Sequence, residues 1–405
     1  MTNDGPAAAG DTSQDALPLR ATGGITLRET LIGSATLFAF VVIIFGVYGA
    51  WLGGKFLNNS TLSFFIYENV PLFLIAIGVT IVLASGQFDL SAGFLATLCT
   101  FLTIGLYVNQ GIPLELVIPI VLAVGILAGL LNAFLVNVFQ LNPFIATLGT
   151  GGIFLGLYTL YGNGSDITFT ATPSTTHASQ WFTGINGLGS YSAKANIVVV
   201  WVLLVLLVLA AWSVVSLQFR HSNRLAVRSV SGVVAALVLA GLAYTGFPSE
   251  FNWTMVLLLF VALANWAVLR FTRFGRSIYA TGGNPVAARL SGIKVNRMTT
   301  LAFVASAFFA AAAGVILAAD QGTAVPGIAD NYLLPAYAAA FLSTVILSHG
   351  RFHIWGALVG GTALVYINQG LATGGVSFLW TNLINGIVLI VAVSVSTGLR
   401  RHLNR

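Results

Sequence analysis

Long apolar runs separated by short polar segments make up most of this 405-residue chain. A helix that crosses a membrane needs about 20 mainly apolar residues, because each residue adds about 1.5 Å to a hydrocarbon core about 30 Å thick. Strands of a membrane barrel would instead alternate over about ten residues. By this length the pattern predicts an all-α membrane protein with about twelve transmembrane helices, near residues 33–53, 66–85, 92–109, 114–139, 144–161, 196–218, 229–246, 252–270, 298–319, 333–347, 353–372 and 376–398.

Basic residues at the ends of these runs predict how the chain is oriented. Fourteen of the 17 Lys and Arg fall within 20–28, 220–228, 270–297 and 400–405. Basic residues concentrate on the cytoplasmic side of a membrane, and the twelve spans place an even number of crossings between any two groups. We therefore expect both termini in the cytoplasm and the polar loop 162–195 on the extracytoplasmic side.

The remaining segments complete the expected organisation. Residues 1–30 have no apolar run, which predicts a disordered cytoplasmic tail rather than a signal peptide. Residues 31–398 form the transmembrane domain, and residues 399–405 form a second cytoplasmic tail.

The composition indicates that the surface faces lipid. Hydrophobic residues make up 57% of the chain and charged residues 7%, whereas a soluble protein carries about 25% charged residues. The net charge of +6 does not indicate nucleic-acid binding, because the basic groups flank the spans and are not interleaved with aromatic residues. The single cysteine, Cys99, lies in an apolar stretch, which predicts core packing rather than a disulfide or a metal site.

Two polar interruptions of the apolar pattern are candidates for function, because unwound backbone in a membrane must face a ligand, water or protein. The first, at 85–93, contains Asp89; the second, at 347–353, contains His349, Arg351 and His353 and predicts a cytoplasmic-side turn. A carboxylate at membrane depth costs roughly 2.5–3.5 kcal/mol, so Asp89 must have a partner within the protein. Two alternatives remain open, namely a cap on the helix that begins near Ser91 and a position on the translocation pathway.

Polar and small residues inside the spans extend these candidates. Asn132 and Asn385 predict either pathway contacts or hydrogen bonds between helices. With Asp89, Gln87 and Phe144 they form the candidate pathway set. Glycines at four-residue spacing predict close helix packing at Gly125, Gly129, Gly356, Gly360 and Gly361.

The basic loop 271–297 carries the clearest local signals. Residues 282–284 predict a turn, Pro285 suits the first position of a helix, and Gly292 suits its end. A helix of two turns is too short to be stable alone, so it would gain stability by docking on another protein. An ordinary basic loop that only sets topology is the alternative. The candidate coupling residues are Gly283, Asn284, Pro285, Ala287, Ala288, Arg289, Leu290, Ser291, Gly292 and Ile293, with Arg289 as the expected charged contact.

This loop closely resembles the coupling segment of permeases in the ribose, xylose and autoinducer-2 group of ABC sugar importers, which reads FGR-x-x-Y-A-x-G-G-N-x-x-A-A-x-x-S-G-I. Residues 86–93 (GQFDLSAG) are similar to that family's GGIDLSVG, and residues 142–150 (NPFIATLGT) to its PPFIATLGT. The resemblance covers roughly residues 66–398. It implies a ten-helix importer core in which residues 196–250 are a two-helix insertion.

The resemblance also implies partners and a location. These are a second permease copy in a homodimer or heterodimer, a cytoplasmic ABC ATPase, an extracytoplasmic solute-binding protein and the lipid of a bacterial inner membrane. ATP and Mg would be bound by the partner ATPase. The chain itself has no GxxxxGK[ST] phosphate loop, so no cofactor is expected on it and it is not expected to be an enzyme.

The expected cargo is a neutral monosaccharide or polyol. A charged solute would need a counter-ion on its path, and apart from Asp89 the spans offer mainly amides, hydroxyls and aromatic rings. A nucleoside permease is one alternative. A stand-alone ion-coupled transporter is another, although it would require several intramembrane acids.

Overall fold

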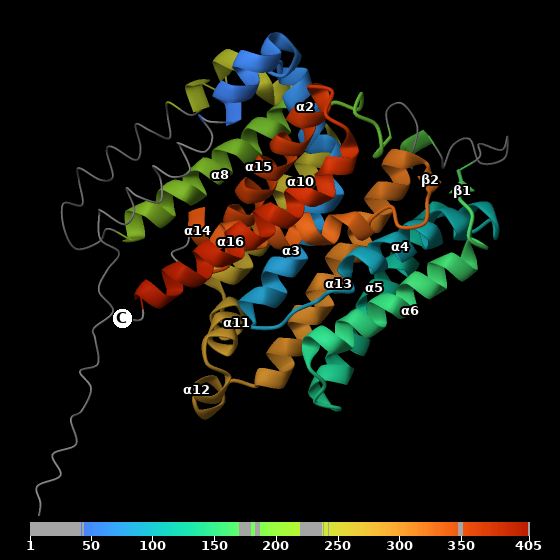
Figure 1. Ribbon diagram of the computed structural model, residues 1–405, viewed down its shortest axis with the longest axis vertical. Helices are drawn as coiled ribbons and strands as arrows, with labels where there is room; N and C mark the ends of the chain where they lie inside the picture. The colour runs from blue at the N-terminus through green and yellow to red at the C-terminus, as the bar shows by residue number, and fades with distance from the viewer. Residues whose placement is uncertain are drawn as a thin grey trace, which may run out of the picture.

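The computed structural model describes residues 44–169, 187–218, 243–346 and 351–403, with a few isolated residues between these ranges. It is mainly helical (Figure 1). The helices are α2 (Asn59–Glu68), α3 (Val70–Ala84), α4 (Ala92–Val108), α5 (Leu114–Asn137), α6 (Pro143–Tyr161), α8 (Ile197–Gln218), α10 (Trp253–Phe271), α11 (Arg273–Gly283), α12 (Pro285–Leu290), α13 (Val295–Gln321), α14 (Leu333–Ile346), α15 (Ile354–Thr373) and α16 (Thr381–Leu403). The shorter elements are η1 (Gly53–Lys55), β1 (Ile167–Thr168), η2 (Phe247–Glu250), β2 (Thr323–Ala324), η3 (Asp330–Tyr332) and η4 (Phe378–Trp380).

Helix α13 lies at the centre and packs against α3, α4 and α5. Glycine allows the close approach of α5, because a Cβ on Gly129 would lie 2.6 Å from the Cα of Val304. On the other side of the bundle, a Cβ on Gly356 of α15 would lie 2.7 Å from the Cβ of Ser343 on α14. The packing role predicted for these glycines is confirmed, and Cys99 is buried as expected.

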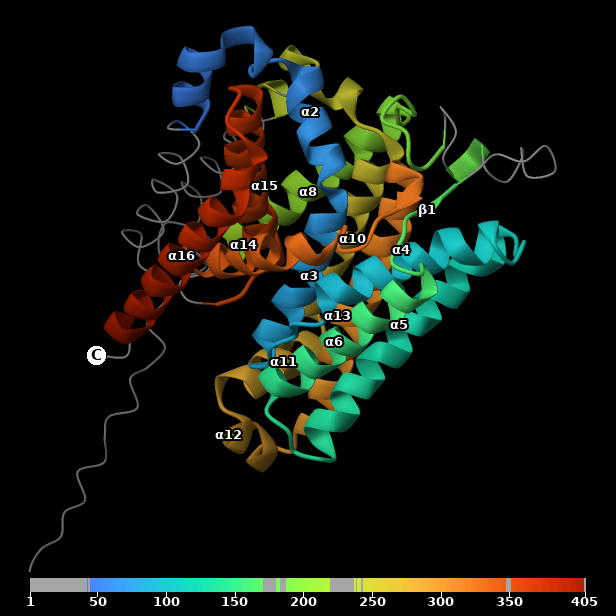
Figure 2. The same cartoon turned by 45° about the vertical axis from the view of Figure 1, so that its right-hand side comes forward.

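Two sets of helices flank this centre. Figure 2 shows α16 on one side of α3 and α13, with α5 and α6 on the other. Helices α11 and α12 protrude at one end of the bundle, away from η2 and the β1–β2 pair (Figure 1). The basic loop and the described parts of the polar loop, residues 162–169 and 187–195, are therefore separated by the bundle.

The number of membrane spans is resolved only in part. Among the described residues, α5, α6, α10 and α13 are long and apolar enough to cross a membrane, and α2 with α3 makes a fifth candidate if a bent pair counts as one span. The chain is therefore a multi-pass helical membrane protein. Residues 1–30 and most of the expected span 229–246 lie outside the described residues, as do residues 347–350 of the second interruption.

The expected span 66–85 is interrupted, which is a correction. Helices α2 and α3 meet at Asn69 with a bend of 53°. Pro71 lacks an N–H and cannot continue the helical hydrogen-bond ladder, while the Asn69 side chain donates to the Phe65 carbonyl over 2.9 Å. The local chemistry of these residues explains the bend.

Two further expectations at element ends need correction. Residues 282 and 283 belong to the last turn of α11 rather than to a turn, so the basic loop contains two helices instead of one. Thr272 caps α11 by accepting the Gly275 N–H over 3.3 Å. Helix α16 runs to Leu403, so residues 399–403 continue a helix that was expected to end at residue 398.

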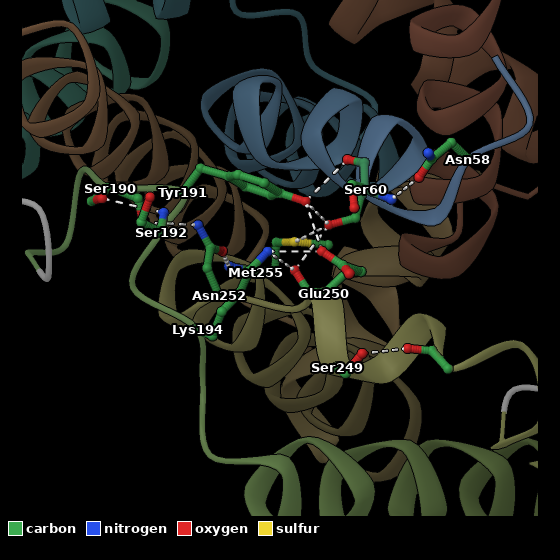
Figure 3. Close-up of polar contacts among 12 residues, drawn as sticks. Asn58, Ser60, Ser190, Tyr191, Ser192, Lys194, Ser249, Glu250, Asn252 and Met255 are labelled. Carbon is green, nitrogen blue, oxygen red and sulfur yellow. Dashed lines mark hydrogen bonds and ion pairs between the residues drawn. The ribbon is translucent and has the colours of Figure 1, made fainter. Parts of the chain in front are cut away.

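A polar cluster closes the base of residues 196–250 (Figure 3). The backbone of Lys194 forms an isolated antiparallel β-bridge with that of Asn252, and the Lys194 Nζ lies 3.0 Å from the Glu250 carboxylate. The same ammonium lies 3.7 Å from the centre of the Tyr191 ring. The ion pair lowers the pKa of Glu250 below its usual range. The two ends of the segment are thus held together.

Candidate functional site

The first interruption places Asp89 in a fully buried position between α3 and α4. Its carboxylate accepts the Ser91 backbone N–H at 3.0 Å and the Ser91 hydroxyl at 2.6 Å. The other carboxylate oxygen accepts the Ser306 hydroxyl of α13 at 2.7 Å. Both oxygens are therefore hydrogen-bonded, which offsets part of the cost of burying the group.

A second layer of hydrogen bonds joins this loop to other helices. The Asn132 amide of α5 donates to the Ser91 hydroxyl over 2.9 Å, and the Thr150 hydroxyl of α6 donates to Asn132 over 2.6 Å. The backbone N–H of Asp89 donates to the Tyr337 hydroxyl of α14 over 2.8 Å. We call Asp89, Ser91, Asn132, Thr150, Ser306 and Tyr337 the Asp89 network.

The expectation that Asp89 is partnered inside the protein is confirmed. It accepts the backbone N–H of Ser91, the residue before α4, but none from the first turn of that helix, so it does not cap α4 as the first alternative expected. Its other oxygen connects the loop to α13 instead. For Asn132, the predicted hydrogen bonding between helices is confirmed. A role for either residue on the translocation pathway remains a prediction.

The other pathway candidates lie in different surroundings. Gln87 lies on the same loop, and its buried Oε1 has no hydrogen-bond partner within the described part of the chain. The next residue, Phe88, is 40% exposed and stacks on Tyr337, and Phe144 at the start of α6 is 51% exposed. Asn385 on α16 accepts the Asn368 amide of α15 over 2.9 Å, so it joins two helices that do not contribute to the Asp89 network.

Helix α12 in the basic loop has the ends that the sequence predicts. Asn284 precedes it and accepts the backbone N–H groups of Val286 at 3.1 Å and Ala287 at 3.0 Å. Pro285 is its first residue, and Gly292 follows its end with a φ of 81°, which favours glycine. The short helix is thus closed at both ends by its own sequence.

The exposed face of α12 is apolar. Val286 is 70% exposed and Leu290 is 85% exposed, and their spacing of four residues puts them on one face. Ala288 is buried, so it cannot contact a partner directly. Arg289 lines a groove of about 720 Å³ beside α12, together with Lys294. The surface combines two apolar side chains with nearby positive charge, which is typical of a protein-docking site.

Sequence reasoning missed three further acids that are partly buried near the other end of the bundle. Gln369 donates to Glu68 over 2.8 Å, and Tyr67 donates to Asp320. Asp330 accepts the hydroxyls of Thr97 at 2.7 Å and Tyr158 at 2.9 Å. Each acid lies at the end of an apolar run, where a charge exposed to water is the ordinary expectation. The sequence carries no signal that distinguishes such an acid from one that is partly buried and hydrogen-bonded within the protein.

Comparison with known proteins identifies the family. Residues 61–217 and 222–393 match the family described as the permease component of the branched-chain amino acid transport system. The chain belongs to this permease family. It is 30% identical to the ribose import permease protein of Bacillus subtilis over 79% of each chain. It is 26% identical to the xylose transport system permease protein of Haemophilus influenzae, over 88% of this chain and 94% of that one.

The autoinducer 2 import system permease protein of an Enterobacter species is also similar, with 28% identity over 93% of this chain and 91% of that one. No solved structure matches the chain. These matches make the chain the membrane permease component of a bacterial ABC importer, and such a component does not itself hydrolyse ATP. The resemblance stated for its motifs is confirmed.

Proposed function

We propose that this permease carries a neutral hydroxylated solute, a monosaccharide or a polyol, delivered by an extracytoplasmic binding protein and driven by a separate ATPase. The similarity to ribose and xylose permeases over most of the chain supports a sugar. The chemistry at the first interruption supports a neutral one. The single observation on which the proposal rests is that the Asp89 carboxylate is fully buried and already hydrogen-bonded.

A solute that passes the first interruption meets amide and aromatic groups there. Phe88 and Phe144 are exposed, and the Gln87 acceptor, which is buried and has no partner among the described residues, would become available to a solute if the loop opens. Aromatic faces and a few amides suit a solute with apolar faces and hydroxyl edges. A charged solute would leave its charge unpaired, at a cost of several kcal/mol.

Two other cargoes remain to be tested against this proposal. The family description names branched-chain amino acids, which carry two opposite charges and would need a partner for each. A nucleoside is neutral and would fit the same groups. An ion-coupled transporter is set aside, because the chain is a permease of an ABC importer.

The proposed docking surface for the ATPase is α12. Val286 and Leu290 would enter a groove on the ATPase, and Arg289 would pair with an acid at its rim. Burying one exposed leucine contributes roughly 1.5–3 kcal/mol, so the two apolar side chains would dominate the contact. The remaining residues from Gly283 to Ile293 would hold the helix in shape through its two caps.

We also propose the complete topology: twelve spans, both termini in the cytoplasm, and two permease copies in the complete importer. Residues 196–250 form an inserted helical pair, which is supported by the bridge of Lys194 with Asn252 at its base. Single cysteines introduced at Lys194 and Arg289 test the orientation. A membrane-impermeant thiol reagent applied to intact cells should label the first and spare the second; the reverse pattern would overturn the topology.

The function is tested with permease, ATPase and binding protein reconstituted in lipid nanodiscs. Neutral pentoses, hexoses and polyols should stimulate ATP hydrolysis when the binding protein is present. Stimulation by leucine alone would favour the amino-acid alternative, and stimulation by nucleosides alone would favour the nucleoside alternative. Either result would overturn the sugar proposal. The mass of the same particles reports whether two permease copies are present.

A further inference from the structure

Helix α11 joins the coupling helix α12 to both interruptions of the membrane helices. The two helices share Asn284, whose backbone N–H donates to the Ala280 carbonyl of α11 over 3.1 Å while its side chain caps α12. Because one residue ends α11 and caps α12, a displacement of α12 is passed directly to the last turn of α11. The other end of α11 is held tightly against α10, since a Cβ on Gly275 would lie 1.9 Å from the Leu269 carbonyl oxygen.

The last turn of α11 touches the first interruption backbone to backbone. A Cβ on Gly282 would lie 2.2 Å from the carbonyl oxygen of Ala84, the last residue of α3. In the opposite direction, a Cβ on Gly86 would lie 3.1 Å from the Cα of Gly282. No side chain lies between the two backbones that could change conformation to absorb a shift, so the end of α3 must move when α11 moves. Three residues after Gly86 lies Asp89, whose network reaches α5, α6, α13 and α14.

One turn earlier, α11 touches the second interruption. The Tyr279 hydroxyl donates to the Phe352 carbonyl over 2.8 Å. Burial raises the pKa of Tyr279 to about 12, so the hydroxyl keeps its proton. Phe352 precedes α15, and its ring lies 5.5 Å from that of Phe341 on α14. A single helix of the basic loop therefore contacts the break before α4 and the break before α15.

We propose that α11 transmits the movement of α12 to both breaks at once, with Gly282 and Tyr279 as the positioning residues of this route. The inference rests on the proposed docking of α12 on the ATPase. Its consequence is that the two breaks, which lie more than 250 residues apart in the chain, change together when the ATPase closes. The direct connection of α12 to α13 provides a second route, so the experiment must isolate α11.

A thiol reporter at the first interruption makes this separation. The chain has one cysteine, Cys99, which is buried, and Phe88 is 40% exposed, so Phe88→Cys introduces one accessible thiol. The complex with the ATPase is treated with a maleimide, with and without a non-hydrolysable ATP analogue. The analogue should change the labelling rate of Phe88→Cys several-fold. Binding-protein-stimulated ATP hydrolysis and solute uptake are measured on the same preparations, before and after the second substitution.

Gly282→Ala is the first test variant, because its new methyl group collides with α3. Solute transported per ATP hydrolysed should fall by about 2- to 30-fold, the range expected for residues on a coupling route, while the ATPase still co-purifies. Gly283→Ala is the matched comparison, since a Cβ there meets no atom within 4 Å, and its effect should be much smaller. Tyr279→Phe keeps the buried ring and removes one hydrogen bond, so it should lower the same ratio without loss of folded protein.

The outcomes separate the two proposals. If the ATPase does not bind the parent permease, the proposed docking function fails before the inference is reached. If the ATPase binds and the labelling response is the same in the parent, Gly282→Ala and Tyr279→Phe, the α11 route is wrong although the docking proposal stands. Loss of the labelling response in both variants, with the ATPase still bound, supports the route.

Discussion

The Asp89 network and α12, the proposed coupling helix, are built in opposite ways. The hydrogen bonds of the Asp89 network join residues up to 248 positions apart, and its carboxylate is completely buried. The backbone and side-chain bonds that close α12 join residues within a segment of ten, and the apolar face of α12 is exposed. The network therefore depends on the whole fold, whereas the two ends of α12 are set by neighbouring residues and its apolar face is left exposed. Substitutions in the first should lower stability, and substitutions in the second should lower coupling.

Among the substitutions considered, Asp89→Leu should lower the free energy of unfolding the most. It strands the Ser91 N–H and the hydroxyls of Ser91 and Ser306, and each stranded buried donor costs about 1–3 kcal/mol. The free energy of unfolding should fall by at least about 2 kcal/mol. Heating in detergent with a thiol-reactive dye measures it, because Cys99 is buried until the protein unfolds.

Asp89→Asn is the matched control for this prediction. The amide oxygen can still accept from Ser91, and the Ser306 hydroxyl can rotate to accept from the new amide group. The loss should be about 1 kcal/mol, clearly smaller than for leucine. Equal unfolding temperatures for the parent and Asp89→Leu would show that the network does not stabilise the fold.

Leu290→Ser should produce the converse result. Leu290 is 85% exposed, so its removal leaves the unfolding temperature unchanged. If α12 docks on the ATPase, the affinity should fall by about 10- to 100-fold, since burying a leucine contributes roughly 1.5–3 kcal/mol. Leu379→Ser, at a position that is 73% exposed and outside the basic loop, serves as the control. Binding of the ATPase to permease in nanodiscs, followed by biolayer interferometry, measures both; an unchanged affinity for Leu290→Ser would contradict the docking surface.

Asn284→Ala tests the stability of α12 separately from its exposed apolar face. The substitution removes the two hydrogen bonds that cap the helix, at a cost of about 1 kcal/mol, while Val286 and Leu290 remain. Hydrogen exchange of the α12 amides should accelerate by about fivefold. Asn284→Asp keeps an acceptor and should exchange like the parent. Fast exchange in the aspartate variant as well would show that the side-chain oxygen does not hold the helix start.

The sequence predicts α12 more completely than the Asp89 network, because the contacts of α12 are local and those of the network join distant residues. The ends of α12 were predictable because Asn284, Pro285 and Gly292 act on their immediate neighbours. For Asp89, the need for a partner was predictable from the cost of burial, but Ser306 and Tyr337 were not, because only the fold brings them to it. Helix α11 was missed because its first turn reads as a polar loop.

The same contrast explains the errors in the spans. Apolar length identified the candidate helices, and the bend at Asn69 was missed because only two polar residues, Glu68 and Asn69, separate the apolar residues of α2 and α3. The acids Glu68, Asp320 and Asp330 were missed because a charge at the end of a run gives no sign of whether protein or water surrounds it. Contacts between distant residues decide these cases.

Lys194→Met should have the smallest effect on stability. It tests whether the ion pair of Lys194 with Glu250 holds the two ends of residues 196–250 together. Lys194 and Glu250 are partly exposed, so their ion pair contributes less than about 1 kcal/mol. Because Lys194 lowers the pKa of Glu250, this stabilisation is present above the carboxyl's unfolded pKa and is lost as the pH falls through its lower folded value. Parent and variant should therefore differ slightly in unfolding temperature at pH 7 and converge as the pH falls through the lowered folded pKa of Glu250. High salt should shrink the difference in the same way, since exposed charges are screened. A difference that persists in acid and in high salt would show that a contact other than the ion pair with Glu250, such as that of the ammonium with the Tyr191 ring, closes the base.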